Sequence, residues 1–460
     1  MIQKTAQPRN PMRIGDDMAR LLFASVVLWA PLPGHASDQL GSKTPYAPRQ
    51  EAAGYEAAPA GYAPVAVQLV ARHGSRGLTK AGSDEAALKL WREAEALGAL
   101  TPLGQRFGAD LQRFMAVQKQ VGYGNLSRLG AVEHEQLAQR MVARLPGLFQ
   151  GRQMPVEVLS SGVDRAVDSS RSFAAALQRA APKARVPASW GSDRFLLYFH
   201  RLSESRDVAD TPARQATLKR SLAYQSWLRG PELAAQQHRI DADPRLPAAA
   251  HQVLEGLYSA DFVARLDKPL DAARHVMDLR GAAADLRLEL ERDFSAYVPA
   301  EAAAVFAELD DAEDFYRKGP GLVESGPVTY AIATQLLDDM LDRLAGGEGA
   351  VLRFAHAEIV SPLVSAIGIA GVHQPLPRER PYSHAASPWR TENVIPMAAN
   401  VQWEVWRGAQ GARLVRMLLN EGEADFKPAC DGARLRPGSH FYRVTALVSC
   451  YRGPGDPPRP

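Results

Sequence analysis

The chain has 460 residues, of which 46% are hydrophobic and 23% are charged. This is typical of a soluble globular protein with a sizeable core and excludes a wholly disordered chain or a coiled coil. The 54 Lys and Arg residues against 51 Asp and Glu residues give a net charge of +3, which provides no strong field for nucleic acid or for an anionic membrane surface. Any affinity for anionic ligands must therefore come from a local cluster of basic side chains.

The N-terminus has the pattern of a secretory signal peptide. Residues 21–32 form the only strongly apolar run; two arginines precede it and small residues follow it. The run is too short for a membrane-spanning helix. We predict that residues 1–36 are a signal peptide and that the mature protein is soluble and periplasmic or secreted. A start at Met12 or Met18 would change only the length of the leader.

The next segments predict an arm followed by alternating strands and helices. Residues 37–63 are rich in Ala, Pro, Gly and Tyr without periodicity, which predicts an extended N-terminal arm. Residues 64–194 are interpreted as the first part of an α/β core. Near-continuous apolar runs predict buried strands at 65–71 and 156–159. Helices are predicted at 85–97 and 165–177.

The middle of the chain changes character. Residues 195–325 are dominated by Ala, Leu, Glu, Arg and Gln with apolar residues at helical spacing, which predicts an inserted helical cap. The α/β core resumes at 326–452, and 453–460 is expected to be a flexible tail. The resumed core is predicted to contain a helix through Ile332 to Leu344 and strands at 351–355, 401–406, 414–419 and 442–448.

The motif Arg72-His73-Gly74-Ser75-Arg76 follows the first predicted strand. Two guanidinium groups around one imidazole suit a phosphoryl group, because each Arg offers a planar fork of donors and the His offers a nitrogen nucleophile. Gly74 is expected to let backbone amides approach the ligand. The carboxyl end of a strand is also where open α/β sheets bind ligands. The alternative is a basic turn with a hydrogen-bonded histidine.

Two further motifs occupy similar places. His356 and Glu358 follow the strand at 351–355, and in an extended backbone both side chains would face one pocket, an arrangement for phosphate binding and proton donation. A buried structural histidine and a pair of metal ligands are the alternatives, although a metal would lack a third ligand at useful spacing. Ser361-Pro362 is a helix-start signal. Arg165 lies just past the strand at 156–159. Alone it would be interpreted as a surface arginine, but together with the other motifs it is predicted to supply a third guanidinium group for the phosphate.

Cys430 and Cys450 are the only cysteines, and a turn-like stretch around Gly438 separates them. In an oxidising compartment two cysteines flanking a hairpin predict a disulfide rather than a zinc site, which would need further ligands. Two unrelated buried thiols are the alternative.

Together these motifs resemble the histidine acid phosphatase family, branch 2 of the histidine phosphatase superfamily. The Arg-His-Gly-x-Arg motif is at 72–76, the middle arginine at Arg165, and the His-Ala-Glu form at 356–358 is typical of multiple inositol polyphosphate phosphatases and their bacterial phytase relatives. Stretches at 100–104, 126–133, 315–320 and 396–400 resemble the same branch. One departure is Gly77-Leu78-Thr79, where many relatives carry an aromatic residue and a proline.

The resemblance implies a mixed, mostly parallel sheet flanked by helices, with an inserted, mostly helical cap. It also implies that His73 attacks phosphorus to form a phosphohistidine, that Glu358 donates a proton, and that the phosphoryl oxygens are held by Arg72, Arg76, Arg165 and His356. No metal or cofactor is needed, and an acidic working pH follows as a hypothesis. The substrate would be an inositol polyphosphate such as phytate, cleaved stepwise. Phosphates other than the one being cleaved would be bound by cations around the pocket mouth, for which the candidates are Lys80, Arg201, Arg317 and Lys318.

Other functions stay open. The runner-up is a broad-specificity acid phosphatase or sugar phosphatase of the same family. Non-enzymatic alternatives are an exported phosphate-ester binding protein and a structural exported domain. We expect a small-molecule phosphate ester as the ligand, no nucleic acid, no membrane after signal removal, and no obligatory protein partner.

Overall fold

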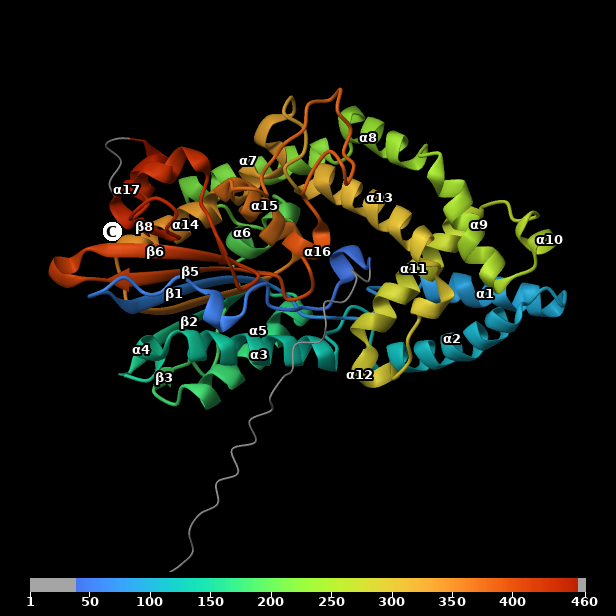
Figure 1. The fold of residues 1–460 in the computed structure, drawn as a ribbon, viewed down its shortest axis with the longest axis horizontal. Helices are drawn as coiled ribbons and strands as arrows, with labels where there is room; N and C mark the ends of the chain where they lie inside the picture. The colour runs from blue at the N-terminus through green and yellow to red at the C-terminus, as the bar shows by residue number, and fades with distance from the viewer. Residues whose placement is uncertain (1–38, 152, 454–460) are drawn as a thin grey trace, which may run out of the picture. The chain divides into compact units, whose positions relative to one another are not determined.

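The computed structural model describes residues 39–151 and 153–453. The predicted signal peptide and residues 454–460 of the predicted tail lie outside them. A mixed sheet organises the described chain, in the order β3-β2-β4-β1-β5-β6-β7, with β8 pairing with β6 (Figure 1). The strands are β1 Ala63–Arg72, β2 Met154–Ser160, β3 Ala184–Arg185, β4 Gly349–Ala355, β5 Asn400–Arg407, β6 Arg413–Leu419, β7 Gly422–Ala424 and β8 Phe441–Arg443.

The sheet has a parallel part and an antiparallel part. β3, β2, β4 and β1 run parallel to their neighbours, because long stretches of chain that include helices connect them. β5 pairs antiparallel with β1, and the remaining strands continue antiparallel. The predicted mixed α/β architecture is confirmed, but the expectation of a mostly parallel sheet is wrong: three strand pairings are parallel and four are antiparallel, because hairpin connections dominate the C-terminal strands. The parallel pairing is confined to the part that carries the predicted site motifs.

Helices cover both faces of the sheet (Figure 1). On β1, Val67 and Leu69 pack with α3 and α5, whereas Ala66 and Val70 contribute to the core shared with α14 and α15. This alternation buries both faces of β1 and explains its near-continuous apolar sequence. The helices nearest the sheet are α3 Arg128–Arg144, α4 Pro146–Phe149, α5 Asp164–Ala180, α14 Thr334–Ala345, α15 Ala357–Ile367, α16 Thr391–Val394 and α17 Val444–Arg452.

A second group of helices begins over the sheet, where α6 and α7 contact α14, and continues to one side of it (Figure 1). It comprises α6 Arg194–Leu197, α7 Pro212–Trp227, α8 Pro231–Asp241, α9 Arg245–Leu257, α10 Ala260–Val263, α11 Pro269–Asp285, α12 Arg287–Leu290 and α13 Ala300–Lys318. Two earlier helices, α1 Ser83–Ala96 and α2 Pro102–Val121, pack against α11 and α9. We call α1, α2 and α6–α13 the helical region. The domain boundaries stay a prediction, but α1 and α2 join this region although they precede residue 195.

Two predicted local structures are wrong. Residues 442–448 were expected to form a strand, but β8 ends at Arg443 and α17 follows, because Val444, Leu447 and Val448 recur at helical spacing and are buried on one face. A short apolar run does not distinguish the two structures by itself. The second error concerns the Ser361-Pro362 start signal: α15 already begins at Ala357, so Pro362 lies inside it.

The predicted disulfide is confirmed. Cys430, in the short 3-10 helix η8 (Pro428–Ala433), is bonded to Cys450 in α17. Between them, an antiparallel bridge from Arg434 to Tyr442 closes the turn that contains Gly438. Throughout residues 39–151 and 153–453, no helix is both long and apolar enough to cross a membrane.

Candidate active site

Two of the predicted motifs meet at the carboxyl edge of the sheet. β1 and β4 are adjacent parallel strands, with Arg72 in register with Ala355, so His73 and His356 both leave the sheet at this edge. The backbone N–H of His73 donates to the carbonyl of Ala355 at 3.0 Å. The two imidazole rings lie edge to face with 5.5 Å between their centroids.

The loop at residues 72–76, which we call the catalytic loop, is fixed from the α3 and α5 side. Glu133 accepts hydrogen bonds from Ser75 N at 2.7 Å and Ser75 Oγ at 2.8 Å. Gly74 N donates to Ser169 Oγ, and a Cβ on Gly74 would lie 2.4 Å from the carbonyl oxygen of Gly130. Glycine is therefore required for the close approach of α3, and its own amide is bonded to Ser169.

His73 has one nitrogen available for chemistry. Its Nδ1 lies 2.9 Å from the carbonyl oxygen of Gly74, and because a carbonyl only accepts hydrogen bonds, Nδ1 must carry the ring proton. This leaves the lone pair on Nε2. Burial, followed by the charges of Arg72 and Arg76, holds the pKa of His73 well below its ordinary value. The imidazole is neutral, which is the form that a nucleophile needs.

Three guanidinium groups surround His73. The Nε atoms of Arg72, Arg76 and Arg165 are all buried and have no hydrogen-bond partner within the described chain. Burial lowers the pKa of all three, although arginine stays charged at any working pH. Buried, unpartnered and positively charged donors are costly unless an anion satisfies them. The arrangement is that of a site for a tetrahedral anion.

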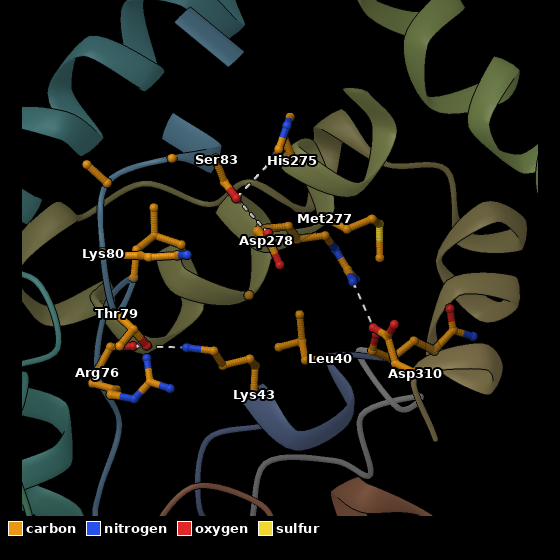
Figure 2. A pocket seen from close by; sticks show the side chains of 16 residues that line it. Leu40, Lys43, Arg76, Thr79, Lys80, Ser83, His275, Met277, Asp278 and Asp310 are labelled. Atoms are coloured by element: carbon orange, nitrogen blue, oxygen red, sulfur yellow. Dashed lines mark hydrogen bonds between the residues drawn. The ribbon is translucent and has the colours of Figure 1, made fainter. Parts of the chain in front are cut away.

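The three arginines differ in how they are held. Arg72 Nη1 donates to the carbonyls of Ser42 at 2.6 Å and Ile395 at 2.5 Å. Arg165, at the start of α5, has its Nη2 3.3 Å from His356 Nδ1. Arg76 lines a cavity of about 490 Å³, and this cavity is the one drawn in Figure 2.

His356 and Glu358 do not share one extended segment as predicted, since His356 has an extended backbone but Glu358 is helical. His356 is the N-cap of α15 and Glu358 lies in its first turn, since the chain turns into the helix directly after β4. Ser161 Oγ lies 2.9 Å from His356 Nε2, and Arg165 approaches the other nitrogen, so both ring nitrogens have protein partners. Burial lowers the pKa of His356 well below its ordinary value.

Glu358 faces cations from the helical region. Lys318 Nζ lies 3.8 Å from Glu358 Oε1 and 2.9 Å from Asp314 Oδ1. Burial raises the pKa of Glu358, but Lys318, His200 and His356 outweigh it and hold that pKa well below the ordinary value. Glu358 is therefore a carboxylate in the free protein.

A second cavity, of about 460 Å³, gathers three of the four predicted substrate-binding cations. It is lined by Arg201, Arg317 and Lys318 together with Glu358 and His200, and also by Arg206 and Arg229. Lys80 lies elsewhere: it lines the cavity of Arg76. The predicted contacts thus divide between two cavities, one at Glu358 and one at Arg76.

Several residues of the site escaped the sequence analysis. His200 is buried against Tyr198, its ring centroid is 6.2 Å from that of His356, and its Nδ1 has no partner in the described chain. Burial lowers its pKa to about 4. No motif marks His200, because it lies at the entry to the helical region. Glu133 ends the stretch at 126–133, but nothing in its spacing indicates that it holds Ser75.

No group of three His, Cys, Asp or Glu side chains suited to a metal ion occurs among residues 39–151 and 153–453. The site consists of the guanidinium groups of Arg72, Arg76 and Arg165, the imidazoles of His73, His356 and His200, and the Glu358 carboxylate with Lys318 beside it. Its groups can bind a tetrahedral anion, attack it with a neutral imidazole and exchange a proton.

Comparisons with known proteins fit this geometry. The family model for the histidine phosphatase superfamily (branch 2) matches residues 65–420. Multiple inositol polyphosphate phosphatase 1 of Gallus gallus is 22% identical over 378 residues, covering 79% of this chain and 77% of the relative.

Solved structures are similar over most of the chain. The apo form of multiple inositol polyphosphate phosphatase from Bifidobacterium longum has 28% identity and a TM-score of 0.81, covering 90% of this chain and 97% of that one. The complex of that protein with phosphate has 28% identity and a TM-score of 0.80, covering 90% and 98%. The phytase from D. castellii, at 15% identity and a TM-score of 0.61 with 91% and 85% covered, shares the fold.

Proposed function

The chain belongs to branch 2 of the histidine phosphatase superfamily, and we propose that it is a phosphomonoesterase that hydrolyses inositol polyphosphates such as phytate, one phosphate at a time. The observation that carries the proposal is the site formed by the catalytic loop and the start of α5, where the buried, unpartnered Nε atoms of three arginines surround a neutral histidine. A phosphoryl group satisfies these donors and presents its phosphorus to His73.

In the first step, His73 Nε2 attacks phosphorus in line with the ester oxygen. An N–P bond forms, the P–O bond to the leaving alcohol breaks, and the guanidinium groups stabilise the phosphoryl oxygens as charge redistributes. Glu358 gives its proton to the departing oxygen, because an inositol alkoxide is a poor leaving group. In the second step, water attacks phosphorus, the N–P bond breaks, and the proton of the water returns to Glu358.

The charges at Glu358 explain how substrate prepares the proton donor. In the free protein Lys318 keeps Glu358 ionised, and His200 and His356 add to this effect only where they are protonated. A bound phosphate is negative and offsets these charges, so it raises the pKa of Glu358 and favours the protonated form. An acidic working pH follows, since Glu358 must take up a proton before the first step.

The cavity at Glu358 supports a polyanionic substrate. Arg201, Arg317 and Lys318 line it within one enclosure, and these cations suit phosphates other than the one cleaved. Structures of the Bifidobacterium longum relative with inositol hexasulfate and with phosphate are known, which supports ligands of the same class here.

We further propose that the protein is exported, to the periplasm or beyond the cell. The Cys430–Cys450 disulfide supports this, because such bonds persist in oxidising compartments. The signal peptide at 1–36 is the matching expectation from the sequence.

The proposal is tested by phosphate release from phytate beside release from a small aryl phosphate, each as a function of salt. We expect a higher specificity constant for phytate at low salt and a Michaelis constant for phytate that climbs with ionic strength. Comparable specificity constants would assign a broad-specificity acid phosphatase instead. Binding of phytate without phosphate release would assign a binding protein.

A further inference from the structure

The cavity beside Arg76 lies between the chain that follows the catalytic loop, the helix α11 and the start of the N-terminal arm. Lys43, Arg76 and Lys80 lie together at one end of it, and Asp310 lies at the other end (Figure 2). Arg76 belongs to the catalytic loop, so the basic end of this cavity adjoins the phosphoryl site. Lys43 comes from the arm at 37–63, to which the sequence assigned no chemistry.

The contacts of Lys43 leave it one free donor. Its Nζ lies 3.4 Å from the carbonyl oxygen of Arg76 and 3.4 Å from Oδ2 of the buried Asp285. An ammonium group has three N–H donors, so one remains after these two contacts within the described chain. The side chain is 26% exposed, which is enough to present that donor to the cavity.

The backbone on both sides of Lys43 is held in place. The carbonyl of Ser42 accepts the hydrogen bond from Arg72, and the carbonyl of Thr44 accepts one from Met397 N at 2.9 Å. Tyr46 N donates to Glu133 at 2.9 Å, and Glu133 also holds Ser75. The arm therefore contacts the catalytic loop directly and through Glu133, and Lys43 sits on a rigid support.

We propose that Lys43 extends the set of substrate-binding cations predicted from the sequence: beside Lys80 it forms an anion subsite for a phosphate of the substrate other than the one being cleaved. This inference rests on the proposed function, since only a polyphosphorylated substrate presents two phosphates at once. Arg76 lines this cavity and also belongs to the catalytic loop that carries His73, so the subsite adjoins the phosphoryl site. Asp278 accepts a hydrogen bond from Ser83 Oγ at 2.6 Å, and the lysines face this carboxylate and Asp310 across the cavity.

The charge on Lys43 adds a signature that a purely structural lysine would lack. Burial, followed by the charge of Arg76, lowers the pKa of Lys43 to about 7, against the opposing effect of Asp285. A bound anion favours the ammonium form of Lys43, so Lys43 takes up a proton when the anion binds above about pH 7. At pH 5.5 Lys43 is already charged, and anion binding adds no proton to it. The charged or titratable groups around Lys43 and the cavity are Arg72, Arg76, Lys80, His275, Asp278, Arg280, Asp285 and Asp310.

The test measures binding of myo-inositol hexasulfate by calorimetry at pH 7.5 and pH 5.5, each in two buffers of different ionisation enthalpy. Sulfate esters do not titrate in this range, so proton uptake reports on the protein. We expect uptake at pH 7.5 with the parent protein and less with Lys43→Arg, which stays charged and retains affinity. Lys43→Met should weaken binding by about tenfold, the size of one charge-assisted hydrogen bond. Lys89→Met, at a side chain 81% exposed on α1, is the control and should bind as the parent does.

Kinetics separate this inference from the proposed function. Lys43→Met should raise the Michaelis constant for phytate and leave that for an aryl phosphate nearly unchanged. A parent protein that neither binds the hexasulfate nor hydrolyses phytate would overturn the proposed function. A parent that does both, with Lys43→Met and Lys43→Arg behaving identically to it, would overturn the subsite alone. Equal losses of kcat on both substrates would also overturn it, because Lys43 would then only support the catalytic loop.

Discussion

At the edge of the sheet, the proposed catalytic groups are held by backbone that cannot move independently of the strands, whereas the helical region presents its charges on side chains at cavity walls. His73 follows β1 and His356 follows the adjacent β4, with their positions set by strand register. In contrast, Arg317 is 45% exposed and pairs with Glu313 one turn away on α13. The comparison indicates that the sheet edge determines the chemistry, while the helical region determines which phosphate ester is held there.

Lys318 and Glu358 lie where the two regions meet. Lys318 ends α13 and Glu358 begins α15, and their 3.8 Å contact joins a binding cation to the proposed proton donor. Substitutions at the sheet edge should therefore change kcat, those in the helical region should change the Michaelis constant, and Lys318 should change both.

The largest effect is expected for His73→Ala. Removing the nucleophile should lower kcat by about a thousandfold or more on every substrate, because no neighbouring group can form the covalent bond. Acid-quenched reactions with labelled substrate should trap a phosphoenzyme in the parent and none in the variant. His251→Ala, at an exposed histidine of α9, should retain activity. Appreciable turnover by His73→Ala would refute the assignment of the nucleophile.

Glu358→Gln should have the next largest effect. We expect a loss of about a hundredfold in kcat on inositol phosphates, the typical contribution of general acid catalysis. The loss on aryl phosphates should be smaller, because their leaving group needs little protonation. Steady-state rates on both substrate classes give the comparison. If the two losses are equal, Glu358 is not the proton donor.

Neighbouring cations on α13 should differ in their effects. Lys318→Met is expected to raise the Michaelis constant for phytate by about tenfold, because solvent screens the partly buried charge of Lys318 poorly. Arg317→Met is expected to raise it by about twofold, because the charge of Arg317 is exposed. The two variants remove one charge each from consecutive residues, so each is the matched control of the other. A larger effect of Arg317→Met would mean that the exposed Arg317, rather than the partly buried Lys318, binds the substrate.

Lys318→Met should also move the pH profile. Lys318 lowers the pKa of Glu358, so its removal raises that pKa. The protonated acid then persists to higher pH, and the limb of the kcat profile at which Glu358 loses its proton should shift upward. An unchanged limb would indicate that Lys318 does not act on the proton donor.

Reduction of the Cys430–Cys450 disulfide should leave the kinetic constants unchanged, because the bond joins η8 to α17 on the sheet side, away from the described site residues. It should lower stability by about 3 kcal/mol on the chain-entropy account of a loop of this size. Thermal melts with and without reductant, at equal protein concentration, measure the change. A loss of activity at temperatures where the reduced protein remains folded would contradict this separation between the disulfide and the proposed active site.

The sequence pattern by itself predicted an α/β core, the site motifs at strand ends and the disulfide, whereas the mixed sheet was implied by the family resemblance. The reason is local: a strand buried on both faces has a continuous apolar sequence, and residues that follow adjacent strands emerge at one edge. Arg72, His73, Arg165 and His356 could therefore be grouped without knowing any distance. The same reasoning was less reliable at residues 442–448, where a few apolar residues fit either a strand or a helix. It also misplaced the start of α15, which begins at Ala357, ahead of the Ser361-Pro362 signal.

Only the tertiary structure decided which side chains from distant segments meet the catalytic loop. Lys43 reaches Asp285, and Lys318 reaches Glu358, because helices and the arm pack at angles and offsets that helical periodicity does not encode. His200 joins the site through packing against Tyr198 and His356. The pKa shifts have the same origin, since burial and neighbouring charges arise only when the chain is folded.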